Sequence, residues 1–246
     1  MGESSAGEGI DRRGLLAAGV GGLVAASALG GEAAAAATGG GTADGLPNTT
    51  HHRVLDRMAR QRAVPVFRDA TWQDALASAR RWVAGGARVV ELTTSTPDVH
   101  RATRALVADG VTVAVGTMRT RADVRRAAAA GASLVMAPGT FPGLIEQAET
   151  EGVIPVPGTM TPTEVYQSLA APLIKIYPAN VVGIPFLQAL LVVYPGLRTY
   201  PNGGFTADPA VARAWLDAGA TAVGIAGSTF GDTGAIRTYL DAVRAG

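Results

Sequence analysis

One local pattern recurs along this chain and limits what it can fold into. A helix-like segment ends in Ala-Gly, and a short apolar run rich in β-branched residues follows at once, as in residues 84–90, 130–135 and 218–223. Glycine readily adopts the left-handed conformation that ends a helix. Because the runs are continuously apolar, they are typical of parallel strands covered on both faces by helices.

Eight runs of this kind predict eight strands, each followed by a helix. Capping threonines mark two of the helix starts: Thr71 precedes Asp74 by three residues, and Thr161 precedes Glu164 in the same way. The economical fold is a small α/β protein of the (β/α)8 TIM barrel type, and an open doubly wound sheet is the alternative. The predicted strands are 64–67, 89–92, 112–116, 134–137, 153–156, 173–177, 198–201 and 222–225.

The N-terminal segment 1–45 differs from the rest. It contains 13 glycines, 12 alanines and no aromatic residue, so we expect a low-complexity Gly/Ala-rich segment that builds no core, with the barrel at 46–246. Arg12 and Arg13 precede an uncharged run, Gly14 to Gly31, which resembles a twin-arginine export signal. A disordered tail or a misassigned start codon is the alternative.

Composition argues against several classes of function. The net charge of the 246 residues is +1, which leaves no basic surplus for a nucleic-acid backbone. There is no cysteine, and the three histidines (His51, His52 and His100) give no metal-site pattern. Without the two arginines and five acidic residues of segment 1–45, the remaining domain has a net charge of +4. That charge suits small anionic ligands.

The chain has twenty arginines but a single lysine, Lys175, which lies in a predicted strand. Strand alternation places Leu173, Lys175 and Tyr177 on one face. Burial favours the neutral amine, and a neutral amine can attack a carbonyl to form an imine, which arginine cannot do. The structural alternative is a lysine whose stem packs in the strand while its ammonium reaches the rim or pairs with Glu91.

Glu91 follows Val89 and Val90 in the second predicted strand, and its alternation with Val89 points it into the barrel. A buried acid needs a partner or a function. Imine formation and carbon–carbon cleavage each move a proton, so a carboxyl group beside the lysine could act as both acid and base. A structural ion pair is again the alternative.

Glycine-containing turns follow the last two predicted strands, at Gly203-Gly204 and at Gly227-Ser228. Barrels of this type commonly bind phosphate with backbone N–H groups of these two loops. The chain contains no P-loop, zinc-protease or EF-hand spacing, and we expect no cofactor.

Seven short segments together resemble, in order and spacing, the family of 2-keto-3-deoxy-6-phosphogluconate (KDPG) and 4-hydroxy-2-oxoglutarate (KHG) aldolases, over about residues 54–244. The resemblance implies a metal-independent class I aldolase that cleaves a 2-keto-3-deoxy-6-phospho sugar acid, or 4-hydroxy-2-oxoglutarate, to pyruvate and an aldehyde. The segments are Val90 to Thr93, Val115 to Thr117, Ala137 to Gly139, Pro155 to Gly158, Lys175 to Ala179, Pro201 to Gly204, and Gly227-Ser228.

The resemblance also implies roles for individual residues. Lys175 would form the Schiff base and Glu91 would shuttle protons. Thr117 and the Pro138-Gly139 turn would line the pyruvate pocket. The phosphate would be bound by Gly203, Gly204, Gly227 and Ser228. The family is usually trimeric, so the expected partners are a small keto acid, and copies of the same chain in a homotrimer.

Two positions depart from the family pattern. Phosphogluconate-type members have an arginine that meets the substrate carboxylate where this chain has Ser95, whereas phosphogalactonate-type members have a small polar residue near this point. Ser95 therefore belongs to the predicted substrate pocket and leaves the sugar open. Asn202 stands where threonine is common and is expected to alter the pocket wall.

Two other functions fit the same residues. The site could decarboxylate or cleave an unphosphorylated keto acid, or the chain could be a non-catalytic binder of phosphorylated ligands. The location also stays open, because sugar-phosphate chemistry favours the cytoplasm while Arg12 and Arg13 favour export.

Overall fold

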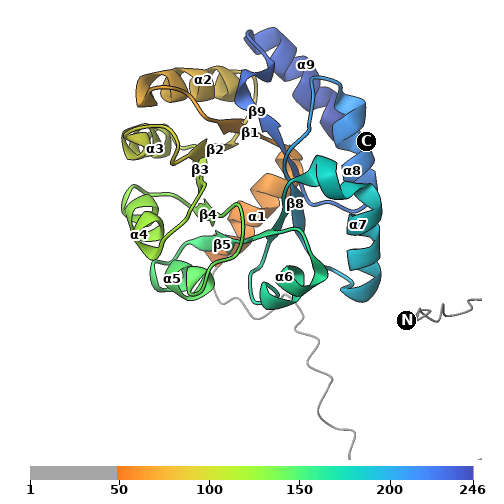
Figure 1. The fold of residues 1–246 in the computed structure, drawn as a ribbon. Coiled ribbons are helices and arrows are strands. Elements are labelled where there is room, and N and C mark those ends of the chain that lie inside the picture. The colour runs from red at the N-terminus through yellow and green to blue at the C-terminus, as the bar shows by residue number, and fades with distance from the viewer. Residues whose placement is uncertain (1–48, 246) are drawn as a thin grey trace, which may run out of the picture. The chain divides into compact units, whose positions relative to one another are not determined.

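The computed structural model describes residues 49–245 and shows a closed ring of parallel strands surrounded by helices (Figure 1). The expected low-complexity segment 1–45, with its export-signal pattern, lies outside the described residues. The strands are β1 Ala63–Phe67, β2 Val89–Thr93, β3 Thr112–Gly116, β4 Leu134–Met136, β5 Ile154–Val156, β6 Gly158–Thr159, β7 Ile174–Ile176, β8 Thr199–Pro201 and β9 Val223–Ala226.

The strand pairings close the barrel. One sheet has the order β5-β4-β3-β2-β1-β9 and a second has the order β6-β7-β8, with every pairing parallel. A parallel bridge between Asn202 and Gly224 joins β8 to β9. Only Pro157 separates β5 from β6, so these two form one barrel strand. The prediction of eight strands in a TIM barrel is confirmed, and the open doubly wound alternative is wrong.

Helices form the outer layer. The predicted caps are present, because the Thr71 side chain accepts a hydrogen bond from the Asp74 N–H and Thr161 forms a reciprocal capping box with Glu164. No helix within 49–245 is long and apolar enough to cross a membrane. The helices are α1 Thr49–Gln61, α2 Trp72–Ala84, α3 Val99–Ala108, α4 Arg121–Ala129, α5 Leu144–Thr150, α6 Pro162–Gln167, α7 Ala179–Val193 with a kink at Gly183, α8 Pro209–Asp217, α9 Thr233–Arg244 and the short 3-10 turn η2 Gly227–Thr229.

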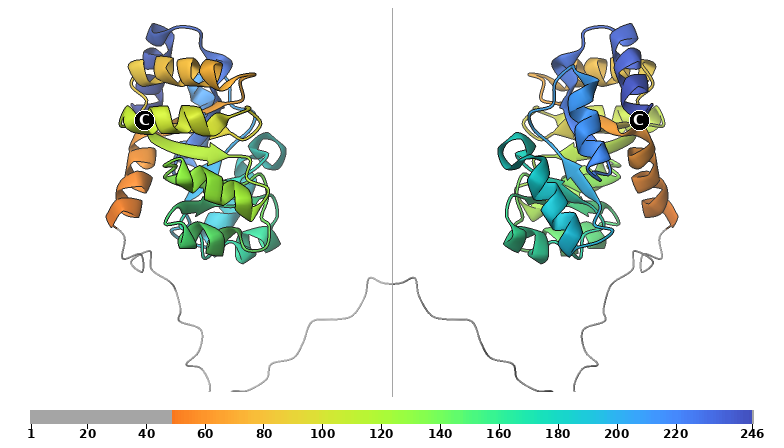
Figure 2. Two further views of the ribbon diagram at one scale, coloured as in Figure 1. Left: turned by 90° about the vertical axis from the view of Figure 1, so that its left-hand side faces the viewer. Right: turned by 90° about the vertical axis from the view of Figure 1, so that its right-hand side faces the viewer.

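Helix α1 lies outside the regular strand–helix order and was not predicted. Figure 2 shows it at one end of the barrel. Its buried residues Val54, Leu55 and Met58 belong to the apolar cluster of the barrel interior, with side chains such as Val89 and Leu173. Helix α1 therefore packs across the end of the barrel where the strands begin.

Candidate active site

A buried ion pair occupies the barrel interior. Lys175 lies in the middle of β7 with only 3% of its surface exposed, and Glu91 on β2 is fully buried. The Lys175 ammonium donates a hydrogen bond of 3.1 Å to Glu91 Oε1. Both side chains therefore point inward, as strand alternation predicts. The Nζ atom also lies 5.7 Å from the ring centres of Tyr177 and Tyr200.

The second carboxylate oxygen of Glu91 has its own partners. The Tyr200 hydroxyl donates to Glu91 Oε2 at 3.0 Å, and Asn202 Nδ2 donates to the same oxygen at 3.3 Å. Burial raises the pKa of Tyr200 well above its usual value, and the negative charge of Glu91 raises it further. Tyr200 therefore stays protonated and acts as a donor. Asn202, which was predicted to alter the pocket wall, contacts the Glu91 carboxylate and is not among the residues that line the cavity.

Two glycines leave room for this network. A Cβ on Gly116 at the end of β3 would collide with the Glu91 carboxylate. A Cβ on Gly224 in β9 would lie 2.5 Å from Asn202 Nδ2 and 2.6 Å from the Tyr200 hydroxyl. Because such contacts are too short for any real Cβ, a larger residue at either position would displace the carboxylate or its donors.

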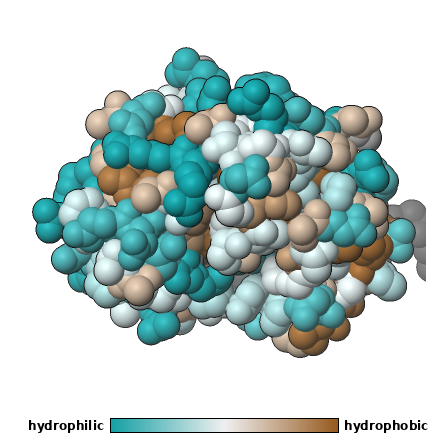
Figure 3. Space-filling view, turned by 90° about the horizontal axis from the view of Figure 1, so that it is seen from above, coloured by the Kyte–Doolittle hydropathy of each residue, from teal (hydrophilic) through white to brown (hydrophobic). Residues whose placement is uncertain are grey.

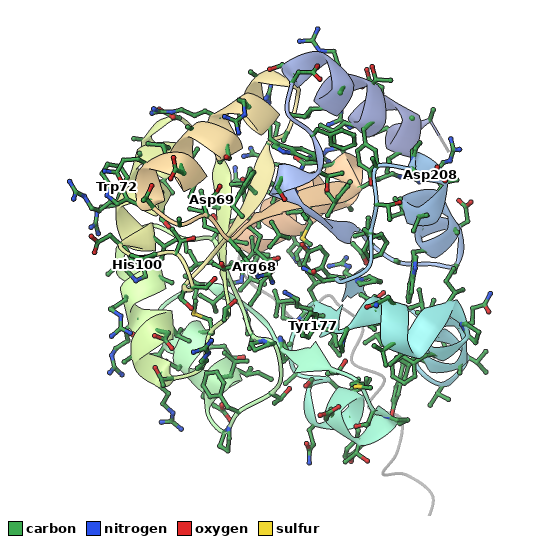
Figure 4. The ribbon with its side chains drawn as sticks, turned by 45° about the horizontal axis from the view of Figure 1, so that its top comes forward. Arg68, Asp69, Trp72, His100, Tyr177 and Asp208 are labelled. Atoms are coloured by element: carbon green, nitrogen blue, oxygen red, sulfur yellow. The ribbon has the colours of Figure 1, made fainter. Side chains whose placement is uncertain are left out.

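A cavity of about 300 Å³ opens beside Lys175. It brings together four predicted site residues, namely Ser95, Thr117, Pro138 and Lys175. Three more residues line it that were not predicted as site residues, namely Arg68, Arg119 and Tyr177. Figure 4 shows Arg68 and Tyr177 near the middle of the ring, while Trp72, His100 and Asp208 lie on its outer part.

Hydrogen bonds of hydroxyl groups stabilise the part of the cavity wall that follows strands β2 and β3. Thr117 has a φ of 64°, which is rare for a β-branched residue, and its carbonyl oxygen accepts a hydrogen bond of 2.9 Å from the Thr94 hydroxyl. The Ser95 and Thr93 hydroxyls lie 2.6 Å apart. Strain of this kind collects at ligand sites, where surrounding contacts enforce it.

The two arginine side chains that line the cavity have no acidic partner among the described residues. Within the described part of the chain, the guanidinium groups of Arg68 and Arg119 form no ion pair and no side-chain hydrogen bond. Each is exposed and follows a strand closely, Arg68 directly after β1 and Arg119 three residues after β3. Their position just past a strand is the signal by which the sequence could have indicated them.

The other predicted residues lie outside this cavity. Gly203 and Gly204 follow β8 with φ values of 105° and 85°, and between residues 49 and 245 nothing accepts a hydrogen bond from their N–H groups. Gly227 is held by Trp82, whose ring nitrogen donates to its carbonyl oxygen at 2.8 Å. None of these, nor Ser228 and Gly139, lines the cavity, although all follow strand ends.

Comparison with known proteins gives a consistent result. The family described as KDPG and KHG aldolase matches residues 54–244. A 2-dehydro-3-deoxy-phosphogluconate aldolase from Treponema pallidum is 31% identical over 157 residues, which are 61% of this chain and 74% of that protein. A 2-dehydro-3-deoxy-6-phosphogalactonate aldolase from Escherichia coli K12 is 27% identical over 168 residues, 66% of this chain and 81% of that protein.

A solved structure agrees with these sequences. The 2-keto-3-deoxy-6-phosphogluconate aldolase of Zymomonas mobilis ZM4, determined with 3-phosphoglycerate, superposes with a TM-score of 0.69 and 26% identity, covering 78% of this chain and 96% of that one. Since the family match spans nearly all of the barrel, this chain belongs to the KDPG and KHG aldolase family.

Proposed function

We propose that Lys175 and Glu91 perform the class I aldol cleavage of a 2-keto-3-deoxy-6-phospho sugar acid, or of 4-hydroxy-2-oxoglutarate, to pyruvate and an aldehyde. The observation that carries this proposal is the chain's single lysine, buried at 3% exposure, lining the cavity and hydrogen-bonded at 3.1 Å to a buried carboxylate. This geometry is typical of an imine-forming lysine with its acid–base partner.

The contacts suggest how the steps proceed. Transfer of the lysine proton to Glu91 Oε1 leaves a neutral amine, which attacks the ketone carbon and forms a carbinolamine once an N–H proton has moved to the ketone oxygen. Glu91 then returns its proton to the carbinolamine hydroxyl, which leaves as water, so that the iminium forms and Glu91 is again a carboxylate. Glu91 then takes the proton of the C4 hydroxyl, the C3–C4 bond breaks, and its electron pair moves into the iminium to form an enamine. Protonation of the enamine carbon and hydrolysis of the imine release pyruvate and restore Lys175.

The reaction needs no metal ion in this scheme, because the iminium accepts the electron pair of the broken bond. Among residues 49–245, no three His, Asp or Glu side chains are grouped so that they could hold a metal. We expect the rate of pyruvate release to be unchanged after treatment with a chelator. A loss of rate that added Mg²⁺ or Zn²⁺ restores would contradict this part of the proposal.

A phosphorylated substrate suits the turns that follow β8 and β9. The free N–H groups of Gly203 and Gly204, with Gly227 and Ser228 in the next loop, would bind the phosphate, helped by Arg68. The Zymomonas mobilis relative was determined with a phosphorylated carboxylic acid. Pyruvate release from phosphorylated and unphosphorylated substrates tests this assignment, and equal rates would contradict it.

A homotrimer is also part of the proposal. Six large apolar side chains are well exposed on or beside α6 and α7, whereas the face seen in Figure 3 shows only separate small groups of hydrophobic atoms. An exposed apolar surface of this kind suits contact with another protein surface. The six are Met160, Tyr166, Leu169, Val181, Val192 and Val193, which we call the α6–α7 patch.

Borohydride reduction tests the lysine directly. Incubation of the protein with pyruvate and borohydride is expected to add one reduced pyruvate to Lys175, detected by intact mass and peptide mapping. Lys175→Arg keeps the charge but is expected to abolish both the adduct and turnover, because a guanidinium is not a nucleophile at neutral pH.

A matched control places a lysine elsewhere. In Lys175→Arg combined with Arg125→Lys, the only lysine is exposed on α4, and no pyruvate adduct is expected there. Retained cleavage by Lys175→Arg, or equal labelling of the exposed lysine, would exclude Lys175 as the Schiff-base residue.

A further inference from the structure

We infer that Arg119 binds the carboxylate of the keto acid and so selects substrates that carry a charge beside the reacting carbonyl. The inference rests on the proposed function, since it assigns one end of the substrate that Lys175 attacks. It comes from the composition of the cavity, in which Ser95 supplies a hydroxyl but no charge.

The carboxylate of a 2-keto acid must lie close to Lys175, because only one bond separates it from the carbon that the amine attacks. Cationic groups lining the same cavity are therefore its strongest available partners. Besides Lys175 itself, the cavity offers two such groups, Arg68 and Arg119. Since neither is paired in the part of the chain that the structure describes, neither must break an existing ion pair to bind an anion.

Strand order separates the two arginines. Arg68 follows β1, which pairs with β9, so it lies on the side of the Gly227-Ser228 loop. Arg119 follows β3, which pairs with β2 and β4, so it lies on the side of Ser95 and Pro138. Two anionic groups of one substrate would therefore be divided between them, the phosphate toward Arg68 and the carboxylate toward Arg119.

Local contacts hold the start of the Arg119 loop in place. The unusual φ of Thr117 turns the chain out of β3, and buried Met118 follows with its N–H bonded to the Met136 carbonyl at 3.0 Å. The Arg119 N–H itself donates to Asp123 at 3.1 Å. These hydrogen bonds hold the backbone at Met118 and Arg119, and from this anchored backbone the Arg119 side chain reaches the cavity.

Two acids that could compete for the Arg119 guanidinium, Asp123 and Glu91, have other partners. The carboxylate of Asp123 accepts hydrogen bonds from the Arg119 and Thr120 N–H groups and pairs with Arg126. Glu91 is engaged by Lys175, Tyr200 and Asn202. A substrate carboxylate would thus be the partner that Arg119 lacks.

The test uses pyruvate and methyl pyruvate, which share the reactive ketone and differ in charge. For each compound, borohydride trapping on the full chain gives the concentration at half-maximal adduct formation. A charge-assisted hydrogen bond is worth roughly tenfold or more in binding, so the wild type is expected to favour pyruvate over the ester by at least about that factor.

Arg119→Gln is expected to raise the half-maximal concentration for pyruvate about tenfold and to leave that for methyl pyruvate unchanged. Arg125→Gln removes an exposed charge from α4, outside the cavity, and is expected to change neither value. The double variant Ser95→Arg with Arg119→Gln again has a guanidinium on the side of the cavity that Ser95 and Arg119 share. We expect this variant to regain the preference for pyruvate.

Three results would overturn the inference. One is an unchanged pyruvate-to-ester ratio in Arg119→Gln, and the second is an equal loss for both compounds. The third is a loss of the preference in Arg68→Gln but not in Arg119→Gln. An absence of any imine on the wild type would instead reject the aldolase proposal itself, so the two failures are distinguishable.

Discussion

At the scale of single residues, the hydrogen bonds of Glu91 determine which of its oxygens can carry a proton. Oε2 accepts from Tyr200 and Asn202, both of which are buried donors. Among the residues that the structure describes, Oε1 accepts a hydrogen bond only from the ammonium of Lys175, a residue that lines the cavity. In the proposed mechanism, a proton that moves between lysine, carboxylate and substrate would therefore travel through Oε1, while Oε2 would anchor the carboxylate.

Tyr200→Phe tests this anchoring. The variant keeps the buried ring but removes the donor to Oε2, so we expect turnover to fall about tenfold or more, since a buried hydrogen bond to a charged group contributes roughly 1.5–3 kcal/mol. Steady-state rates of the variant and the wild type at one fixed pH measure the effect.

The chain contains a matched control. Tyr239 is another buried tyrosine, whose pKa is raised to about 12 by burial and by Asp208, but its hydroxyl has no hydrogen-bond partner among the described residues. Tyr239→Phe is therefore expected to leave turnover unchanged. Equal activity in Tyr200→Phe and Tyr239→Phe would show that Oε2 needs no anchor.

Individual residues differ in how far the sequence predicts them. Lys175 and Glu91 are predictable, because a lone lysine and an acid inside apolar strands need a reason to be there. Tyr200 was missed because an aromatic residue in a strand is normally read as core, and the core cluster does include it. Arg68 and Arg119 were missed because exposed arginines are common, and only the closed barrel brings these two to one cavity.

At the scale of elements, α1 has the clearest structural function. It is amphipathic, and its apolar side closes the end of the barrel opposite the site. Met58→Ala removes a fully buried side chain from this contact, and we expect it to lower the free energy of unfolding by about 2–5 kcal/mol. Urea unfolding measures the change. Asp56→Ala, on the exposed side of α1, is the control and should cost under about 0.5 kcal/mol.

Pyruvate trapping on Lys175 completes this test. If α1 contributes only to stability, the Met58→Ala variant should form the imine as the wild type does at temperatures where the variant is folded. A loss of stability no larger than that of Asp56→Ala would contradict the packing of α1 in the barrel.

His100 on α3 links stability to pH. Burial lowers its pKa below the ordinary value of 6.5, and nearby Arg126 and Arg104 lower it further against the opposing charges of Asp123 and Asp98. Below about pH 6.5 the unfolded state therefore binds a proton that the folded state resists, so this group makes stability fall as pH decreases. Its Nδ1 is buried and has no partner in the described part of the chain.

His100→Gln should flatten this part of the stability profile. Urea unfolding at about pH 7.5 and about pH 5.5 is expected to show a smaller loss of stability on acidification than in the wild type. The control is His52→Gln, which replaces a half-buried histidine on α1. This variant should lose as much stability on acidification as the wild type. An identical pH dependence in His100→Gln and the wild type would rule out this histidine as a source of acid sensitivity.

The elements themselves were largely predictable, because the Ala-Gly ends of helices and the apolar runs after them are local signals. Gly86, Gly131 and Gly219 have the positive φ values that the pattern requires. The split of one barrel strand around Pro157 was not predicted, since proline only locally interrupts the hydrogen bonding. Helix α1 was missed because its role depends on the barrel end that it covers, and no local pattern encodes that.

At the scale of the whole molecule, α1 covers one end of the barrel and the other end carries the cavity, so we expect the proposed trimer to form through the sides of the barrel. The α6–α7 patch is the best candidate surface, with Val192 at 81% and Val193 at 65% exposure. When another surface covers apolar side chains, the contact is stabilised by about 25 cal/mol per Å² of apolar surface removed from water. Figure 1 places α7 on the opposite side of the ring from α3.

Val181→Asp combined with Val192→Asp therefore tests the trimer. The wild type is expected to have three times the chain mass by light scattering after size exclusion, and the double variant to be monomeric, because burying two carboxylates in an apolar contact is unfavourable. Val107→Asp, at an exposed valine on α3, is the control and should remain trimeric. Since Lys175 and Glu91 contact each other in the interior of the barrel, the monomeric variant should still form the pyruvate imine on Lys175. A wild type that is monomeric at micromolar concentration, or a double variant that stays trimeric, would show that the α6–α7 patch is not the interface.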